Sequence, residues 1–324
     1  MTEVLVDEHG DPSVLSVSAG ADPDRAPGEV PVDVAAAGVN FADLAKRRGE
    51  YPGGPQPPYI PGIEIAGRVA DGTDDDRFAV GDRVMAYVDR GGYAERATAD
   101  PERTFPVPDG LSLVEAAAVP IQWLTAHNVL FEWGGLDASE RVLVLAGAGG
   151  VGSAAVQLAS AAGADVIATA STTDKRAFAR ELGAARAIDY TDADLAEAIY
   201  AHTDGAGVDL VLDGVGGSAF QAGLDALAAG GRIVTFGFAS GEAPRVSTPR
   251  LLFGNHSVAG YHLGEAADRE PDRALGAMAD IRERIVDGEV APVVDRTFPL
   301  DAAADAHRYV ADRQTTGAVV LEVR

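Results

Sequence analysis

The feature that most constrains the fold is a cluster of glycines between an apolar run and an alanine-rich stretch. The hexapeptide Gly147-Ala148-Gly149-Gly150-Val151-Gly152 follows the apolar run Val142–Ala146 and opens a segment that is rich in alanine. A G-x-G-x-x-G sequence between a strand and a helix is typical of a dinucleotide-binding turn. Its first glycine permits the tight turn, its second lets the backbone approach a pyrophosphate, and its third allows close helix–strand packing. The free N–H groups at the helix start favour that anion. We therefore expect a cofactor at Gly147, Gly149, Gly150, Val151 and Gly152, with a ligand-free turn as the alternative.

The same region could be mistaken for a membrane span. Val142 to Ala164 is a run of 23 residues without a charge, which is long enough to cross a bilayer. The glycine cluster divides this run into a strand and a helix, so we do not expect a span. The segment Met1–Gly10 carries Glu3, Asp7 and Glu8 and has no apolar core, so no signal peptide is expected. A cytoplasmic location is the prediction.

Strand-like and helical segments alternate through the middle of the chain, which predicts a doubly wound, parallel six-stranded sheet. The strands are expected at Val142–Ala146, Asp165–Ala170, Ala185–Ile188, Val208–Leu212, Arg232–Phe236 and Ser257–Tyr261. Among the helices, we expect a single long one from Asp268 to Val286 and one that begins at Ala193.

The rest of the chain has a sequence pattern typical of β-structure with irregular connections. Short alternating segments broken by Gly and Pro run from Glu29 to Asp100, and a β pattern returns at Val293–Phe298 and Ala318–Val323. The tail is therefore expected to fold back onto the first domain. We predict a β-rich domain of residues 1–118 and 288–324 and an α/β domain of residues 119–287.

Charge excludes several classes of function. The chain has 26 Lys and Arg against 50 Asp and Glu, a formal net charge of −24. Such a surface repels nucleic acid and anionic membranes, so neither is expected as a partner. It also suggests a host with concentrated internal salt, where the repulsion is screened; an acidic protein from an ordinary host is the alternative. Because the chain has no cysteine, it has no disulfide, thiolate nucleophile or Cys-ligated zinc.

The residues after the second strand indicate which dinucleotide is bound. An NAD-binding domain usually places an acid there, where it accepts from the ribose 2′-hydroxyl. This chain has Ser171 at that place and no acid, and Lys175, one of two lysines, follows four residues later. Because the chain otherwise avoids lysine, Lys175 is a candidate to pair with a 2′-phosphate. This interpretation favours NADPH as the cofactor. The alternative is an exposed lysine at a helix start, beside Asp174.

Several motifs, in order along nearly the whole chain, resemble the medium-chain dehydrogenase/reductase superfamily, and in particular its zinc-independent quinone oxidoreductases of the zeta-crystallin group. They are Ala35–Leu44, Gly49–Pro52, Pro61–Gly67, Gly81–Val84, Gly91–Glu95, Gly149–Gly152 and Leu182–Ala184. The resemblance implies a GroES-like catalytic domain, a Rossmann NADP-binding domain, and an active site in the cleft between them. It also implies a homodimer that pairs through Ser257–Tyr261.

The chain lacks the ligands that zinc-dependent members of that superfamily use. Asn40 stands where they have a Cys, and Ile63 stands where they have a His. The six histidines show no metal-type spacing, so no metal is expected. Without zinc to polarise a carbonyl, alcohol oxidation is disfavoured. We expect hydride transfer from NADPH to a small quinone; the alternatives are an enone or enoyl-thioester reductase and a non-catalytic NADPH-binding protein.

The resemblance also implies roles for individual residues. Asn40 and Tyr51 would be catalytic, with Asn40 and Thr125 beside the nicotinamide. The 2′-phosphate would contact Ser171, Lys175 and Tyr190, and the nicotinamide would be bordered by Phe236, Gly237 and Phe238. From the residues alone, Asn40 is equally a turn residue, and Tyr51 could pack among the surrounding prolines.

Overall fold

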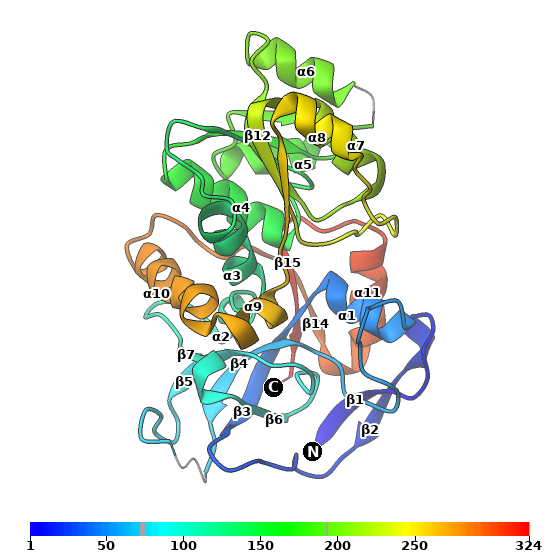
Figure 1. Cartoon of the computed structure of the whole chain (residues 1–324). Helices are drawn as coiled ribbons and strands as arrows, with labels where there is room; N and C mark the ends of the chain where they lie inside the picture. The colour runs from blue at the N-terminus through cyan, green and yellow to red at the C-terminus, as the bar shows by residue number, and fades with distance from the viewer. Residues whose placement is uncertain (72–74, 192–193, 324) are drawn as a thin grey trace. The chain divides into compact units, whose positions relative to one another are not determined.

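The computed structural model describes residues 1–71, 75–191 and 194–323, and the chain divides into two compact units (Figure 1). Unit 1 comprises Met1–Gln122 and Ala291–Arg324, and unit 2 comprises Trp123–Val290. The observed boundaries lie a few residues after those expected from the sequence.

Unit 2 is built on a six-stranded sheet in the order β10-β9-β8-β11-β12-β13, and every pair in it is parallel. Its strands are β8 (Arg141–Val144), β9 (Asp165–Thr169), β10 (Arg186–Ile188), β11 (Val208–Asp213), β12 (Leu227–Thr235) and β13 (Ser257–Gly260). The chain runs outward from β8 to β10 and then returns to β11 on the other side of β8. The predicted doubly wound sheet is confirmed, and its strand order reverses between β8 and β11, where such sheets bind their ligands.

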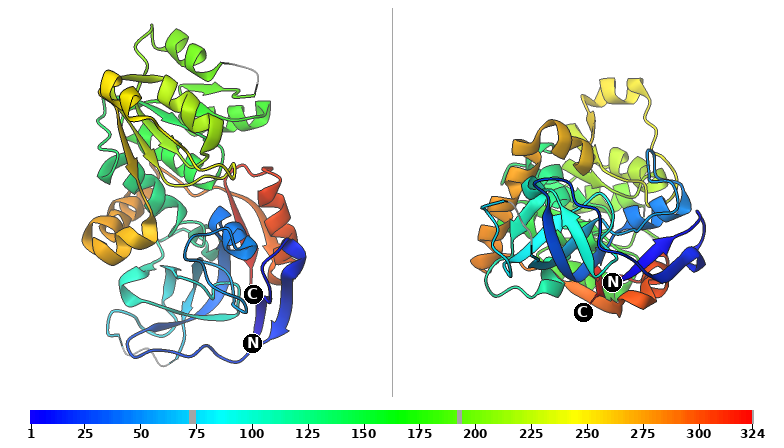
Figure 2. Two further views of the ribbon diagram at one scale, coloured as in Figure 1. Left: turned by 45° about the vertical axis from the view of Figure 1, so that its right-hand side comes forward. Right: turned by 90° about the horizontal axis from the view of Figure 1, so that it is seen from below.

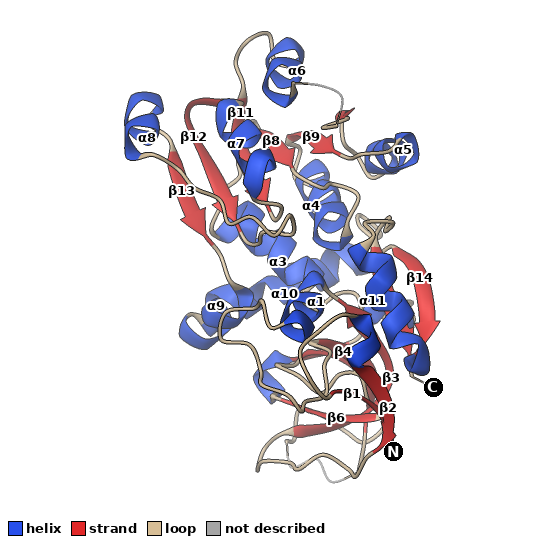
Figure 3. Ribbon diagram, turned by 90° about the vertical axis from the view of Figure 1, so that its right-hand side faces the viewer, coloured by secondary structure: helices blue, strands red, loops and turns tan. Residues whose placement is uncertain are grey.

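Helices α4 (Gly150–Ala161), α5 (Thr173–Glu181), α7 (Gly217–Asp225) and α8 (Thr248–Gly254) pack along this twisted row of strands (Figure 3). The other helices are α3 (Gln122–His127), α6 (Leu195–His202), α9 (Leu263–Arg269) and α10 (Pro271–Val286). Apolar side chains from four neighbouring strands are fully buried beneath them: Leu143, Ile167, Val211 and Ile233. The burial of these side chains is the main stabilising contribution in the unit.

One predicted helix was wrong. The single helix expected from Asp268 to Val286 is two helices, α9 and α10, which meet at Glu270 and Pro271. Proline has no N–H to continue α9, and it pushes the preceding residue out of the helical region. Glu270 accordingly has φ −136° and ψ 56°. The start expected for another helix, Ala193, lies outside the described residues.

The charge-free run forms β8 and α4, with the glycine turn between them. Across the described part of the chain, no helix has the length and apolar character to cross a membrane. A short π-helical turn, η3 (Asn128–Glu132), continues α3.

Unit 1 holds a seven-stranded sheet. Its strands follow the order β14-β15-β3-β4-β5-β7, with β6 paired to β3. They are β3 (Val30–Val39), β4 (Glu64–Val69), β5 (Arg83–Tyr87), β6 (Arg96–Ala99), β7 (Thr104–Pro106), β14 (Val294–Pro299) and β15 (Ala318–Glu322). β14 and β15 are parallel and the other pairs are antiparallel. Because β15 pairs with β3, the segment after unit 2 completes this sheet.

Smaller elements surround the sheet of unit 1. β1 (Thr2–Val6) and β2 (Leu15–Ala19) form a separate antiparallel ribbon, dark blue in Figure 2. The helices are α1 (Phe41–Arg48), α2 (Leu113–Ala116) and α11 (Ala303–Ala311). Along β3 the alternating Val30, Val32 and Val34 are all buried, which explains the alternation in the sequence.

Candidate functional site

The glycine turn lies at the carboxyl end of β8, at the point where the strand order reverses. Gly149 is the N-cap of α4, with φ −80° and ψ 178°. Thr169, at the end of β9, holds the turn: its hydroxyl accepts from the Ala146 N–H at 3.1 Å, and its carbonyl accepts from the Gly147 N–H at 2.9 Å. The N-terminus of α4 is therefore fixed at the sheet edge where an anion is favoured.

The glycines of this turn differ in whether the fold itself requires them. A Cβ on Gly152 would lie 2.2 Å from the Ala146 carbonyl oxygen, and one on Gly147 would lie 2.7 Å from the Ala168 Cβ. A Cβ on Gly149 would meet Ala146 O at 3.5 Å, an ordinary contact, and nothing closer in the described part of the chain. The fold thus needs glycine at positions 147 and 152, whereas at 149 it leaves open space above the helix start. This open cradle fits the pyrophosphate of a dinucleotide.

Three residues expected at the 2′-phosphate lie at the same edge of the unit 2 sheet. Ser171 follows β9, Lys175 lies in the first turn of α5, and Tyr190 follows β10 with a side chain 41% exposed. β9 and β10 are neighbours, with Ile188 paired to Thr169, so their carboxyl ends lie side by side. The Thr172 hydroxyl accepts from the Lys175 N–H at 3.2 Å and fixes the start of α5.

A second cation at this place was missed in the sequence. Arg176 contacts the Asp189 carboxylate, and its guanidinium also donates to the Thr173 hydroxyl at 3.2 Å. The ion pair joins α5 to the segment that carries Tyr190. The adjacent Lys175-Arg176 pair was a usable signal, but the sequence does not reveal that Arg176 contacts Asp189.

The remaining cofactor candidates of unit 2 follow β12 or lie on α3. Phe236, Gly237 and Phe238 come directly after β12, and Thr125 is a buried residue of α3. Asp213, which the sequence analysis missed, holds the neighbouring turn. Its carboxylate accepts from the N–H groups of Val215 at 3.0 Å and Gly216 at 2.8 Å, and from the Thr235 hydroxyl at 3.0 Å. Burial raises the pKa of Asp213, although these donors oppose the rise.

The two catalytic candidates flank α1 in unit 1. Asn40 is the N-cap residue of α1, and Tyr51 follows its C-cap, Gly49. The backbone of Asn40 is extended, and its N–H donates to the Asp43 carboxylate at 2.9 Å. Its side chain, however, points to a different acid and is buried, with 8% exposed. The structure therefore brings Asn40 into a buried polar cluster.

That cluster is centred on Glu64 at the start of β4. The Glu64 carboxylate accepts from Asn40 Nδ2 at 2.7 Å and from the Ile121 N–H at 2.9 Å, with Gln122 Nε2 more distant at 3.5 Å. Glu64 is fully buried, and burial raises its pKa to about 8, with the nearby Asp43 adding to the rise. The sequence analysis included Glu64 in the Pro61–Gly67 motif but assigned it no role. The signal that could have identified it is an acidic residue between Ile63 and Ile65 in a predicted strand, because an acid in so apolar a segment is expected to be buried.

Tyr51 is half-buried beside a lysine. The Lys46 ammonium lies 5.3 Å from the centre of the Tyr51 ring, and this lysine donates to the Asp89 carbonyl at 3.2 Å. Burial raises the pKa of the Tyr51 hydroxyl, and the Asp43 charge raises it further. The phenol is therefore held in its protonated form, in which it can donate a hydrogen bond.

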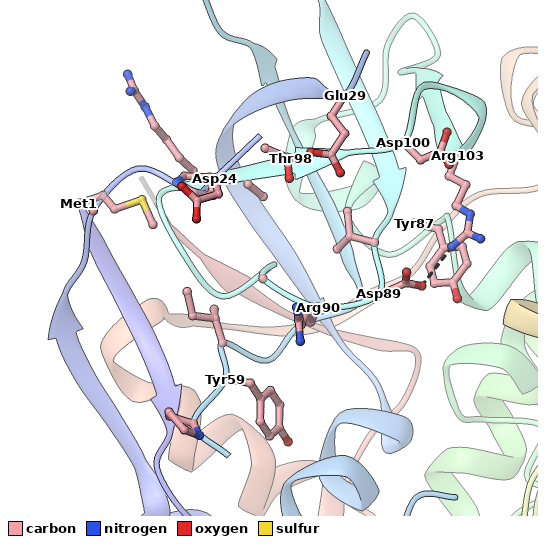
Figure 4. A pocket seen from close by; sticks show the side chains of 18 residues that line it. Met1, Asp24, Glu29, Tyr59, Tyr87, Asp89, Arg90, Thr98, Asp100 and Arg103 are labelled. Atoms are coloured by element: carbon pink, nitrogen blue, oxygen red, sulfur yellow. Dashed lines mark hydrogen bonds and ion pairs between the residues drawn. The ribbon is translucent and has the colours of Figure 1, made fainter. Parts of the chain in front are cut away.

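A hollow of about 630 Å³ lies elsewhere in unit 1 (Figure 4). Its charged lining residues are Asp24, Glu29, Asp89, Arg90, Arg96, Asp100 and Arg103. Two of these arginines are already paired: Arg103 with Asp89 at 3.0 Å, and Arg96 with Asp22 and Asp33. None of the residues expected at the site lines this hollow.

Metal-ligating side chains do not gather in the part of the chain that the structure describes: no three or more His, Asp or Glu side chains group as an ion site there. Glu64 is surrounded instead by an asparagine and a glutamine, whose amides donate to it.

Comparison with known proteins places the chain in a family. Residues 26–109 match the alcohol dehydrogenase GroES-like domain family, and residues 150–280 match the zinc-binding dehydrogenase family. A quinone oxidoreductase of Pseudomonas aeruginosa is 38% identical over 317 residues, which cover 97% of each chain. The structure of the Escherichia coli quinone oxidoreductase in complex with NADPH is 30% identical in sequence and superposes with a TM-score of 0.93. The structure of a mycobacterial protein in complex with NADPH is 34% identical and superposes with a TM-score of 0.94. Both comparisons cover all of each chain. The predicted GroES-like and Rossmann domains are confirmed, and the chain belongs to the medium-chain dehydrogenase/reductase superfamily of oxidoreductases.

Proposed function

We propose that this oxidoreductase is an NADPH-dependent quinone oxidoreductase that needs no metal. Unit 2 would be the cofactor domain and unit 1 the catalytic domain. The names of the relatives in P. aeruginosa and E. coli support a quinone as acceptor, and the two NADPH complexes support the cofactor.

The observation that carries the proposal is the chemistry around Asn40. At the position of a zinc ligand in zinc-dependent members, this chain has an amide that is fixed by Glu64 at 2.7 Å. An amide and a phenol can donate hydrogen bonds to an oxygen but cannot replace zinc as a Lewis acid. They therefore suit an acceptor that is already electrophilic, such as a quinone or a conjugated enone.

When bound, NADPH would supply the hydride that reduces the quinone, and a proton from solvent would complete the hydroquinone. Asn40 and Tyr51 donate hydrogen bonds to the acceptor oxygen, on which negative charge develops. In unit 2 the start of α4 would bind the pyrophosphate, and Phe236, Gly237 and Phe238 would border the nicotinamide with Thr125. Ser171, Lys175 and Tyr190 would bind the 2′-phosphate.

An acceptor panel tests the proposal. NADPH oxidation is measured with a series of benzoquinones and naphthoquinones, and in parallel with conjugated enones and enoyl-CoA thioesters. We expect kcat/KM to be highest for quinones. Higher values with enones or enoyl thioesters would make the protein a reductase of that class. Tight NADPH binding without turnover of any acceptor would favour a non-catalytic role.

Metal independence has its own test. We expect elemental analysis of the active enzyme to find no stoichiometric zinc, and EDTA to leave kcat unchanged, because Asn40 and Ile63 replace the Cys and His ligands. Stoichiometric zinc together with EDTA-sensitive activity would contradict this part of the proposal.

A further inference from the structure

A buried carboxylate lies directly behind the amide that we propose as catalytic. Glu64 is fully buried at the start of β4, and its Oε1 accepts from Asn40 Nδ2 at 2.7 Å. The Glu64 carboxyl group also lies close to the backbone of β3. A Cβ on Gly38 of β3 would lie 2.3 Å from Glu64 Oε1 and 2.6 Å from the Ala117 carbonyl oxygen. The sheet thus leaves space for this carboxyl group by having no side chain at position 38.

Among the described residues, each group that forms a hydrogen bond with the carboxyl group is the donor. Asn40 and Gln122 offer amide N–H groups to Oε1, and the Ile121 backbone N–H donates to Oε2. An ionised carboxylate accepts from all of them, because it has about four lone-pair sites and no hydrogen of its own. Since a carboxylate cannot donate, it forces the NH₂ end of the Asn40 side chain toward itself. The amide oxygen of Asn40 then faces away, 3.5 Å from Gln122 Nε2.

This orientation leaves one hydrogen of the Asn40 NH₂ group without a partner among the described residues. We propose, on the basis of the proposed function, that Glu64 is a positioning residue: its carboxylate fixes the Asn40 amide so that the second amide hydrogen donates to the oxygen of the acceptor. Glu64 acts through Asn40 and does not itself touch the substrate. Without it the amide can rotate and present its oxygen, which repels the developing charge.

Protonation of Glu64 changes which orientation of the Asn40 amide is favoured. A neutral carboxyl group can donate to the Asn40 oxygen, so both amide orientations become available. Since burial raises the pKa of Glu64 to about 8, the fixed orientation gains population as pH rises through this value. The other titratable groups that face Glu64 are Asp43, with a pKa raised to about 6, and the phenols Tyr93 and Tyr87, whose pKa values burial raises above the usual 10. A titration that falls between that of Asp43 and those of the phenols would therefore report Glu64.

Side-chain amide spectra test the coupling without any turnover. The chain has three asparagines, Asn40, Asn128 and Asn255, so ¹⁵N-asparagine labelling gives three NH₂ signal pairs. We expect the Asn40 pair to shift between pH 6.5 and 9 with a midpoint near 8, and Glu64→Gln to abolish this shift. Asn128 and Asn255 are internal controls. An Asn40 pair that ignores both pH and the substitution would overturn the proposal.

Kinetics test the consequence. With whichever acceptor the enzyme turns over, we expect Glu64→Gln to lower kcat about tenfold and to remove its rise with pH, while the Kd for NADPH stays within twofold. The control is Glu115→Gln in α2 of the same unit, because glutamine keeps the capping role that Glu115 has toward Ser112. We expect this variant to behave as wild type. A Glu64→Gln enzyme with unchanged kcat and pH profile would show that Glu64 is merely structural. If no acceptor is turned over, the proposed function fails while the spectra still decide the role of Glu64.

Discussion

Substitution of two glycines in the same turn separates ligand binding from folding. Gly149→Ala places a methyl group where the described structure has an ordinary contact at 3.5 Å, so we expect the fold to accept it. Alanine is a poorer N-cap than glycine, but it restricts the unfolded chain more, and these effects of below about 1 kcal/mol each oppose one another. We therefore expect Tm to change by no more than a few degrees.

Cofactor affinity should respond very differently. The methyl group of Gly149→Ala occupies the space through which the backbone approaches the pyrophosphate, so one charge-assisted hydrogen bond or more is lost. At about 1.5–3 kcal/mol for such a bond, the Kd for NADPH should rise roughly ten- to a hundredfold. Titration of NADPH fluorescence measures this, at a fixed high KCl concentration so that the net charge is screened equally in all samples.

Gly152→Ala is the matched control with the opposite outcome. Its Cβ would lie 2.2 Å from the Ala146 carbonyl oxygen, so the start of α4 must move away from the turn. Overpacking of this kind costs about 1–3 kcal/mol, which corresponds to a Tm lower by roughly 2–12 °C in a unit of this size. Equal losses of Tm in both variants, or an unchanged Kd for NADPH in Gly149→Ala, would refute the conclusion that Gly149 serves cofactor binding and Gly152 serves folding.

Three further predictions concern the cofactor, the charge and the assembly. Lys175→Ala should raise the KM for NADPH about tenfold and leave NADH kinetics nearly unchanged, because only NADPH carries the 2′-phosphate; equal losses with the two cofactors would dismiss the phosphate contact. Tm and activity should rise between 0.1 and 2 M KCl, because screening relieves the repulsion of a net charge of −24; a flat or falling Tm argues against a salt-adapted protein. Two copies should pair through β13, the edge strand of the unit 2 sheet; a monomer mass in solution at high salt would exclude this dimer.

The fold of unit 2 was predictable because its six strands each carry a local signal. The apolar run before Gly147 and the alanine-rich run after it define β8 and α4 whatever the rest of the chain does. The break between α9 and α10 also has a local signal, since Pro271 lies inside the segment predicted as one helix and has no N–H to continue α9.

The polar cluster of unit 1 was not predictable in the same way. Glu64 and Gln122 are 58 residues apart, and Asn40 lies 24 residues before Glu64. What makes them a site is the sheet, which buries the acid against Gly38 and brings the amides to it. Sequence reasoning identified Asn40 through its position in a motif. It could not identify the partner that determines which end of the amide is presented.

The pairing of β15 with β3 has a consequence for biosynthesis. Unit 2 is continuous in the sequence and can fold as soon as residues 123–290 have been made. Unit 1 begins earlier, yet its sheet lacks β14 and β15 until residues 294–322 follow. At about 5–20 residues per second, synthesis of the intervening stretch takes roughly 10–30 s. During that interval the Ala36–Val39 part of β3 lacks the strand that it pairs with, whereas β6 can already pair with Val30–Asp33. A bare strand edge invites pairing with another chain. A nascent chain that stalls near residue 290 therefore contains every strand of the parallel sheet but lacks β14 and β15, and the exposed part of β3 is where we expect a chaperone to be needed.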